Sequence, residues 1–289
     1  YKKLLSITSV EDLPEMLLRD GNISVSKQLA SFRMLFALRQ MEQEKFTLPE
    51  WVLDDKKLAY QFIDRMRVRR PWISDQSYTM ETVDMKDGTV IKPVNGAGSR
   101  GVYLVYSPQE IIDIKRSEKL DTLESLKENM KRDLEVGWVE QNEWLIEELI
   151  LEDKAKQLPA RDIKFYCFYG KVGLVLEIVR YPETKYCWWT PTGENISTGK
   201  YEGLLFEGQG VSTEELELAS NISKKIPTPF IRIDFLRSGK ELVFGEFTPK
   251  PGNYDEFDDE TDRMLGELFL EEQSRLDQHF LAGKSYVDF

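Results

Sequence analysis

The sequence predicts an α+β protein, with a helical first part followed by a longer part that is built mainly from antiparallel β-hairpins. Apolar residues recur at helical spacing through most of residues 1–68. From residue 89 onward, short apolar runs are instead joined by glycine-containing turns. Helices and strands that are segregated along the chain are typical of α+β folds. The clearest change in composition between the two parts falls near residues 71–86.

Composition limits the class of protein. The 289 residues are long enough for about two domains, and 41% hydrophobic with 31% charged residues describes a soluble globular chain. No apolar run approaches the roughly 20 residues that a membrane-spanning helix needs. The net charge of -12 argues against a nucleic-acid partner. Two cysteines, Cys167 and Cys187, are too few for a disulfide framework, so we expect both in the core of a cytoplasmic protein.

Three helices are expected in the first part. Ser9 can cap the first helix, and the second covers residues 26–43. The third covers residues 54–68, with acidic residues early and basic residues late, as the helix dipole favours. A basic cluster follows this helix, and we interpret it as a solvated helix end: Arg67, Arg69 and Arg70.

A glycine-rich hairpin organises the second part. A strand that ends at Lys92 and a return strand over residues 102–105 flank a loop with Gly96, Gly98 and Gly101. Glycine lets backbone N–H groups approach a phosphate chain closely, and the lysine can reach a phosphate oxygen. No Gly-Lys-Ser/Thr closes the loop and a strand follows it, which excludes a Walker loop and a Rossmann fingerprint. Taken alone, the hairpin also fits a tight surface turn.

Further elements follow from capping signals and periodicity. Capping boxes at residues 107–110 and 212–215 predict one helix through Ile112 and another to about Lys225. The remaining elements are expected in this order: an exposed helix over 117–136, a buried strand over 144–151, a hairpin over 161–180, strands over 230–236 and 241–247 joined by a turn at 238–239, and an amphipathic helix over 260–281.

Two carboxylates are expected to face each other across the last hairpin. Its turn lies about midway between Asp234 and Glu246, so the two side chains can oppose one another on neighbouring strands. Paired carboxylates repel unless a cation lies between them, and Mg²⁺ is bound by one or two carboxylates together with nucleotide phosphates. Arg232 alternates onto the same face and can hold an oxyanion bidentately. In the preceding hairpin, Asp162 and Lys164 share one face.

Five motifs occur in a fixed order over about residues 54–270. They are Lys56-Lys57-Leu-Ala-Tyr; Ile91-Lys-Pro-Val-Asn-Gly-Ala-Gly-Ser-Arg-Gly; Leu145-Ile-Glu-Glu-Leu-Ile; Asp162-Ile-Lys-Phe-Tyr-Cys-Phe-Tyr-Gly-Lys-Val; and Phe230-Ile-Arg-Ile-Asp-Phe with Phe244-Gly-Glu-Phe-Thr-Pro-Lys-Pro-Gly. In this order they resemble the ATP-grasp superfamily, and within it the branch that is similar to teichuronopeptide-biosynthesis proteins. The resemblance implies the ATP-grasp fold, in which ATP lies between two antiparallel α+β lobes.

The resemblance also implies roles for individual residues. Nucleotide phosphates would be bound by Lys57, or alternatively Lys56, by Lys92 and by the glycine loop, which comprises Gly96, Gly98, Ser99, Arg100 and Gly101. The adenine would lie along the strand that carries Glu147, Glu148, Leu149 and Ile150, and Asp162 would hold the ribose. Lys164 and Arg232 would be the catalytic residues, facing the phosphates and stabilising the acyl-phosphate. Mg²⁺ would be held by Asp234, Glu246 and Thr248.

Two features depart from the pattern of the superfamily. Many members have an asparagine where this chain has Thr248, and a hydroxyl is a weaker metal ligand. The first part is helical rather than an open α/β domain. We therefore expect a helical N-terminal region over 1–85, a first lobe with the glycine loop over 86–150, and a second lobe with the metal site and a C-terminal helix over 151–289.

These roles imply an ADP-forming carboxylate–amine ligase that uses Mg-ATP through an acyl-phosphate, and that acts by positioning and charge stabilisation. Its substrates would be a carboxylate and an amine, and analogy points to a cell-envelope polysaccharide or peptide precursor. Two alternatives stay open. One is a phosphotransferase that acts on a hydroxyl, and the other is a non-catalytic nucleotide-binding module of a larger polysaccharide-assembly protein.

Several prominent side chains also have structural interpretations. For Asp162, a surface acid is an equal alternative to a ribose ligand. Arg180 is interpreted as a salt-bridged strand end rather than a γ-phosphate ligand. His279 and the pair Trp188-Trp189 are interpreted as packing residues.

Overall fold

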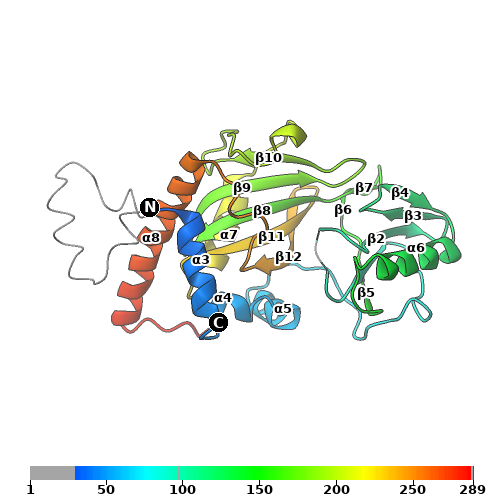
Figure 1. Cartoon of the computed structure of the whole chain (residues 1–289), viewed down its shortest axis with the longest axis horizontal. Coiled ribbons are helices and arrows are strands. Elements are labelled where there is room, and N and C mark those ends of the chain that lie inside the picture. The colour runs from blue at the N-terminus through cyan, green and yellow to red at the C-terminus, as the bar shows by residue number, and fades with distance from the viewer. Residues whose placement is uncertain (1–29, 97, 288) are drawn as a thin grey trace.

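Two five-stranded antiparallel sheets form the body of the protein and lie next to one another along its long axis (Figure 1). The computed structural model describes residues 30–96, 98–287 and 289, so the helix expected from Ser9 lies outside the described residues. Helices cover both faces of the second sheet and one face of the first, which makes the fold α+β as predicted. None of the helices in these ranges is long and apolar enough to cross a membrane.

The first sheet carries the glycine hairpin. Its order is β4-β3-β2-β1-β5, with β1 (Thr89–Pro93), β2 (Tyr103–Ser107), β3 (Glu110–Asp113), β4 (Glu118–Leu120) and β5 (Trp144–Glu148). Helix α6 (Leu123–Glu135) covers one face, where its Leu126 and Met130 pack with Ile91 and Trp144 in a shared core. The opposite face of this sheet is not covered by α6 and faces the space between the two sheets.

Two predictions for this lobe are wrong. Residues 107–110 do not begin a helix but form the tight turn between β2 and β3, where Ser107 pairs with Glu110. The following residues Ile111 and Ile112 have strand neighbours on both sides, so sheet pairing outweighs the local capping signal. The exposed helix expected over 117–136 begins only at Leu123, after β4, and it buries its apolar stripe.

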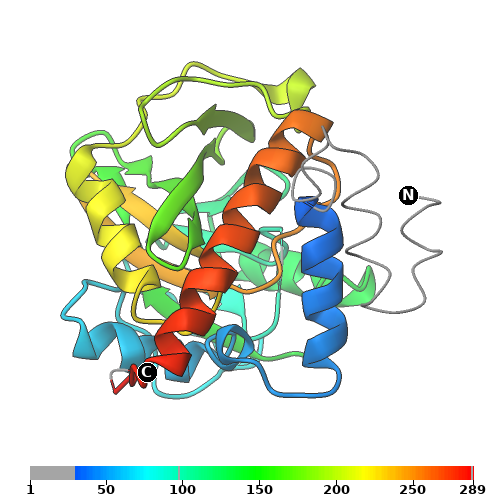
Figure 2. The same cartoon turned by 90° about the vertical axis from the view of Figure 1, so that its left-hand side faces the viewer.

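The second sheet is sandwiched between helices. Its order is β10-β9-β8-β11-β12, with β8 (Arg161–Phe168), β9 (Lys171–Val179), β10 (Lys185–Trp189), β11 (Ile231–Ser238) and β12 (Glu241–Thr248). Helices α5 (Lys56–Arg65) and α7 (Thr213–Ser223) share a core with one face. Helices α3 (Phe32–Gln43) and α8 (Asp259–Leu281) lie beside each other and share a core with part of the other face (Figure 2). The predicted hairpins and the capping box of Ser212 are confirmed.

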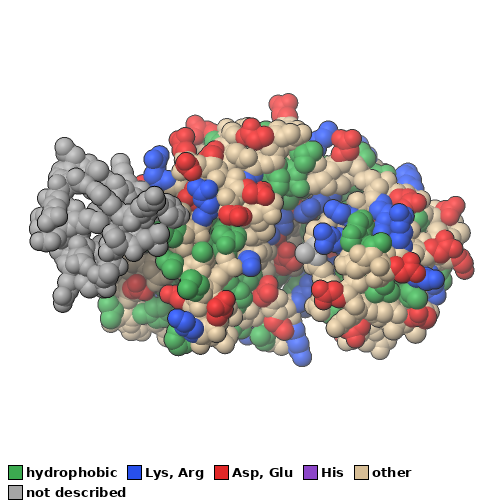
Figure 3. All heavy atoms as spheres, in the orientation of Figure 1, with side chains coloured by type: hydrophobic (Ala, Val, Ile, Leu, Met, Phe, Trp, Pro, Cys, Tyr) green, Lys and Arg blue, Asp and Glu red, His purple; other side chains and the backbone are tan. Residues whose placement is uncertain are grey.

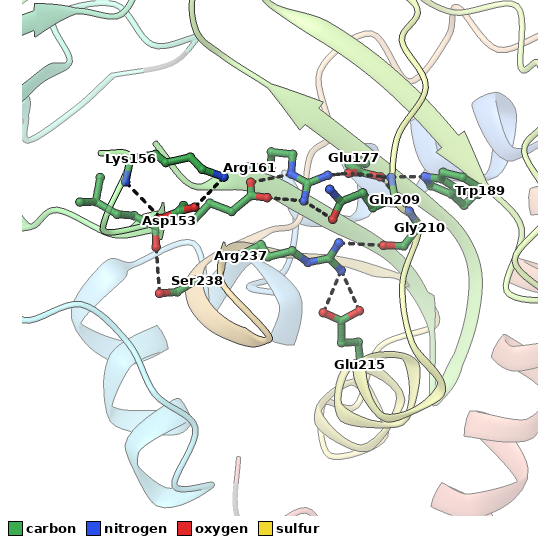
Figure 4. Close-up of polar contacts among 12 residues, drawn as sticks. Asp153, Lys156, Arg161, Glu177, Trp189, Gln209, Gly210, Glu215, Arg237 and Ser238 are labelled. Atoms are coloured by element: carbon green, nitrogen blue, oxygen red, sulfur yellow. Dashed lines mark hydrogen bonds and ion pairs between the residues drawn. The ribbon is translucent and has the colours of Figure 1, made fainter. Parts of the chain in front are cut away.

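The short elements that connect the larger ones are α4 (Pro49–Val52), β6 (Leu151–Asp153), β7 (Leu158–Pro159) and a 3-10 turn η2 (Glu202–Leu204). A polar network that is largely buried ties β6 and residues 209–210 to the second sheet (Figure 4). Arg161 donates to Glu152 of β6 at 2.6 Å and to Gln209 at 2.7 Å. The fully buried Glu177 pairs with Arg161 and accepts from the indole of Trp189 at 3.0 Å. Each buried charge is thus hydrogen-bonded, as burial requires.

The segment between α5 and β1 holds the two lobes together. Residues 72–78 follow β5, the edge strand of the first sheet, with hydrogen bonds from Ser74 N to Ile146 O and from Tyr78 N to Trp144 O. Arg69 reaches both lobes, because its guanidinium pairs with Glu148 of β5 at 2.9 Å and with Glu241 of β12 at 2.7 Å. The interpretation of this arginine as a solvated helix end is therefore wrong.

Candidate functional site

A cavity of about 540 Å³ lies between the two sheets, and the molecular surface is hollowed there, with side chains of both charges at its rim (Figure 3). The first lobe contributes apolar side chains of β1 and β2 and the glycine loop. The second lobe contributes polar residues of β8, β11 and β12, and α5 closes one side. The predicted site residues that line the cavity are Lys92, Gly96, Gly98, Ser99, Arg100, Glu147, Glu148, Leu149, Ile150, Asp162, Lys164, Asp234 and Glu246.

Lys92, near the end of β1, provides the main positive charge of the first lobe. Its ammonium forms a hydrogen-bonded ion pair with Glu147, which lies on the neighbouring strand β5. Burial disfavours the charged ammonium, but the buried carboxylate of Glu147 outweighs it and raises the pKa of Lys92. The lysine is therefore held charged beside the glycine loop.

Helix α5 presents Lys56 to the cavity rather than Lys57. Lys56 lines the cavity, and its Nζ lies 3.9 Å from Oε2 of Glu147. Lys57 is exposed and is not among the lining residues. Successive residues on a helix point about 100° apart, so only one of two adjacent lysines can face the cavity. Burial and the neighbouring charge of Lys92 lower the pKa of Lys56 to about 8.

Replacing Lys56 by Ala should weaken nucleotide binding about tenfold or more, whereas Lys57→Ala should leave it unchanged within twofold. The reason is that, of these two lysines, only Lys56 lines the cavity and can contribute its charge there. Titration calorimetry with Mg-ADP on both variants measures this difference. Equal losses in the two variants would contradict the placement of Lys56.

The glycine loop has two parts with different surroundings. Gly96 and Gly98 line the cavity, and Gly98 has a positive φ of +66°, which favours glycine. Gly101 instead packs behind the loop, where an added Cβ would lie 2.7 Å from a methyl of Val139 and 3.1 Å from Trp144. We infer that Gly101 supports the loop rather than contacting a ligand.

The connection from β5 to β6 offers backbone groups to the cavity. Leu149 N donates to Gly88 O at 2.9 Å and is therefore occupied. In contrast, the N–H of Ile150 donates to no acceptor within the described residues, and Ile150 lines the cavity. A buried N–H needs a partner, so this group suits a ring nitrogen of a base.

Strand β8 places two polar side chains on the floor of the cavity. Asp162 and Lys164 share one face of the strand as predicted, and the ammonium of Lys164 pairs with Asp234 across to β11. Arg180, at the end of β9, donates from Nε to Asp162 at 2.8 Å. Arg180 also lines the cavity, so its salt bridge does not remove it from the site.

A β-bulge sets the register that brings Asp234 and Glu246 together. Asp234 pairs with Glu246, whereas the next pair is Phe235 with Phe244, so Gly245 is the extra residue on β12. The bulge switches the alternation, because Phe244 and Phe247 both point into the same core and Glu246 points to the cavity face. An added Cβ on Gly245 would lie only 3.2 Å from Asp234 O, which explains the glycine.

Arg232 and Thr248 extend the charged cluster beyond the cavity wall. Arg232 donates to both oxygens of Asp234 at 2.7 Å and to the hydroxyl of Thr248 at 3.0 Å. Burial opposes ionisation of Asp234, but Arg232 and Lys164 outweigh it and lower its pKa to about 2. The pKa of Arg232 is raised in return, mainly by Asp234 acting against burial. Both groups stay charged at neutral pH.

Acidification should therefore remove stability that Asp234 provides. Its pKa is about 2 in the fold against an ordinary value of 3.8, so its contribution is complete above about pH 4 and is lost as the pH falls toward 2. The difference corresponds to about 2 kcal/mol. Chemical denaturation at pH 5, 4 and 3 measures the slope, and the Asp234→Asn variant should show a smaller one. Identical slopes would contradict the lowered pKa.

The oxygen donors near the end of β12 fit Mg²⁺. Asp234 and Glu246 face one another in register, and the Thr248 hydroxyl lies 3.4 Å from Asp234 and 3.5 Å from Glu246. Carboxylate and hydroxyl oxygens suit a hard cation that also binds phosphate. Within the described ranges no group of three or more His, Cys, Asp or Glu side chains could hold a metal alone, so phosphate oxygens or water would have to complete the shell.

The remaining prominent side chains are structural. Cys167 and Cys187 are free thiols and are both buried, as predicted. Trp188 belongs to a hydrophobic core, and His279 Nδ1 shares a hydrogen bond with the Tyr169 hydroxyl at 2.8 Å, away from the cavity. Tyr60 and Pro71 also line the cavity and were not predicted, because their positions depend on how α5 and the following segment pack.

The two antiparallel sheets with a charged cavity between them define an α+β protein with the ATP-grasp fold. A family model described as TupA-like ATP-grasp matches residues 36–270, and the chain belongs to this family. No curated protein is matched by the sequence.

Solved structures with this fold are similar at low identity. D-alanine–D-alanine ligase from Bacillus anthracis is 16% identical with a TM-score of 0.43, over 79% of this chain and 69% of that one. The same ligase from Helicobacter pylori is 15% identical with a TM-score of 0.42, over 76% and 61%. The ATP-grasp ligase PsnB, in complex with a precursor variant, Mg and ADP, is 13% identical with a TM-score of 0.43, over 77% and 60%. This chain therefore spans between 60 and 69% of the length of these proteins.

Proposed function

We propose that the protein is an ADP-forming ligase that joins a carboxylate to an amine at the expense of Mg-ATP. The observation that carries the proposal is the composition of the cavity. One wall supplies Lys92 and the glycine loop, and the opposite wall supplies Lys164 with the Asp234–Glu246 pair. Cations for phosphate on one side and oxygen donors for a metal on the other are what phosphoryl transfer needs.

The residues have the following proposed roles. Lys56, Lys92 and the loop residues Gly96, Gly98, Ser99 and Arg100 bind phosphate oxygens. Glu147, Glu148 and Ile150 face the base, and Asp162 together with Arg180 lies on the ribose and phosphate side. Asp234 and Glu246, with Thr248 beside them, hold Mg²⁺, which neutralises charge on the phosphates when bound. Lys164 and Arg232 stabilise the oxyanions of the reacting centre.

The proposed reaction has two steps. A carboxylate oxygen attacks the γ-phosphorus of ATP, which gives an acyl-phosphate and releases ADP. An amine nitrogen then attacks the acyl carbon, phosphate leaves, the nitrogen loses a proton, and an amide remains. We extend the proposal by family analogy to a carboxylate of a cell-envelope polysaccharide or peptide precursor.

Hydroxylamine tests this proposal without knowledge of the natural amine. A panel of carboxylic acids is incubated with Mg-ATP and hydroxylamine, and both ADP and hydroxamate are measured. We expect at least one acid to give the two products in equal amounts, because hydroxylamine intercepts an acyl-phosphate. ADP formation that depends on an alcohol and yields no hydroxamate would instead indicate a phosphotransferase.

A further inference from the structure

A buried lysine, Lys200, lies outside the cavity. Lys200 belongs to the segment that connects β10 to α7, and it is 2% exposed. Among the residues that the structure describes, no carboxylate forms an ion pair with it. Its ammonium instead donates to Asn253 O at 2.7 Å and to Gly252 O at 3.4 Å, and it lies 4.4 Å from the ring centroid of Phe257. Burying an ammonium without an acid is costly, so its position calls for a reason.

The segment that Lys200 holds is the loop over residues 249–257. This loop leads from Thr248, at the end of β12, to α8. A second tie runs alongside, from Asp258 N to Thr198 O at 2.8 Å. Asn253 has a φ of +52°, in the left-handed region that Asn adopts more readily than most residues, and its carbonyl accepts the hydrogen bond from Lys200.

The loop is connected to Arg232 through two aromatic side chains. The ring of Phe257 packs edge-on against Tyr166 at 5.9 Å, and Tyr166 pairs with Arg232 across β8 and β11. Lys200 is also close enough for Arg232 to influence it. Burial lowers the pKa of Lys200 to about 8; Glu256 and Asp255 oppose this shift and Arg232 adds to it. The lysine, the loop and the arginine therefore form one packed unit at the end of the charged cluster.

We propose that Lys200 is a positioning residue: its ammonium fixes the 249–257 loop beside the Glu246–Thr248 segment and, through Phe257 and Tyr166, fixes the place of Arg232. The part of the proposal that concerns Arg232 rests on the proposed function, in which Arg232 contacts the reacting phosphoryl group. No nucleotide contact is assigned to Lys200 itself, because it does not line the cavity.

Hydrogen–deuterium exchange on the full chain tests the first half of the proposal. Lys200→Met keeps the length of the side chain but removes the donors, and Lys200→Arg restores donors that can reach carbonyl oxygens. Lys240→Met, at an exposed turn, is the matched control. We expect exchange over 249–257 to rise about tenfold in the Met variant, with residues 89–105 unchanged, and to return toward the wild-type rate in the Arg variant.

Nucleotide measurements test the second half. Mg-ADP affinity should stay within twofold in Lys200→Met, while acceptor-independent ATP hydrolysis should fall about tenfold because Arg232 is no longer held. Unchanged exchange over 249–257, or an equal rise in both segments, would overturn the proposal, as would failure of a folded Arg variant to restore protection. If the Met variant does not fold, Lys200→Gln takes its place under the same criteria. A wild-type protein that neither binds Mg-ADP nor hydrolyses ATP would defeat the proposed function, whereas the exchange data would still decide the role of Lys200 in the loop.

Discussion

Replacing Asp234 by Asn should abolish magnesium-dependent turnover and also destabilise the fold. The carboxylate is buried and pairs with both Arg232 and Lys164, so a neutral amide leaves two cations without their partner. Removing one member of a buried ion pair costs about 3 kcal/mol or more. The loss of a metal-binding oxygen should lower ATP turnover by at least about 100-fold. Chemical denaturation measures the first effect, and ADP release at saturating Mg²⁺ measures the second.

Glu246→Gln is the matched comparison. Glu246 faces Asp234 in register but is exposed and forms no ion pair among the described residues. Its replacement should therefore reduce turnover on a similar scale and leave stability within about 0.5 kcal/mol of wild type. Normal turnover in both variants would exclude the metal assignment. Equal destabilisation of both variants would show that Glu246 stabilises the fold despite its exposure.

The proximity of the two carboxylates was predictable, because a short turn brings neighbouring segments of the chain side by side. The turn is Gly239-Lys240, with Ser238 opposite Glu241, and a regular register from this turn would place Asp234 opposite Gly245. The bulge at Gly245 was not predicted. Plain alternation puts Phe244 and Glu246 on one face, and only the extra residue separates the core side chain from the cavity side chain. The predicted pairing of Asp234 with Glu246 is confirmed, but it depends on the bulge and not on the turn alone.

Other parts of the site depend on how distant elements pack, and the sequence does not contain that information locally. The choice between Lys56 and Lys57 depends on the rotation of α5 about its axis, which its contacts with β12 determine. Arg69 looked like a helix end because its partners, Glu148 and Glu241, are 79 and 172 residues away. The capping signal at residues 107–110 failed for a different reason, because the neighbouring strands β2 and β4 both pair with the residues that follow it.

The charges of the site are arranged as pairs, and this arrangement reconciles a chain of net charge -12 with the phosphate binding that we propose for the cavity. Lys92 pairs with Glu147, Arg180 with Asp162, and Lys164 and Arg232 share Asp234. Each acid keeps a neighbouring cation charged in a partly buried place. Phosphate groups must therefore compete with carboxylates of the chain for the same cations, so the strength of nucleotide binding should depend on those carboxylates as well as on the lysines.

Replacing Lys92 by Ala should remove the stabilisation that adenine nucleotides give to the protein. In the wild type, Mg-ATP or Mg-ADP at about 100 times its dissociation constant should add about 2.7 kcal/mol to the free energy of unfolding, and Mg-GTP should add less. The variant loses a charge at the glycine loop and also leaves the buried carboxylate of Glu147 without its main partner. Attraction is thereby replaced by repulsion at the same place, so we expect at least about a 100-fold loss of affinity. Thermal melts with the three nucleotides measure the effect.

A double variant separates the two causes of this loss. Lys92→Ala combined with Glu147→Gln removes the repulsion by the carboxylate but does not restore the attraction by the lysine, so the double variant should regain part of the affinity for nucleotide. Lys57→Ala is the control and should match the wild type, because that lysine is exposed. Full recovery in the double variant would mean that Lys92 serves only to neutralise Glu147. No recovery would place the whole effect in direct phosphate binding. If the wild type shows no shift with any nucleotide, the cavity does not bind ATP, and the result counts against the ligase proposal.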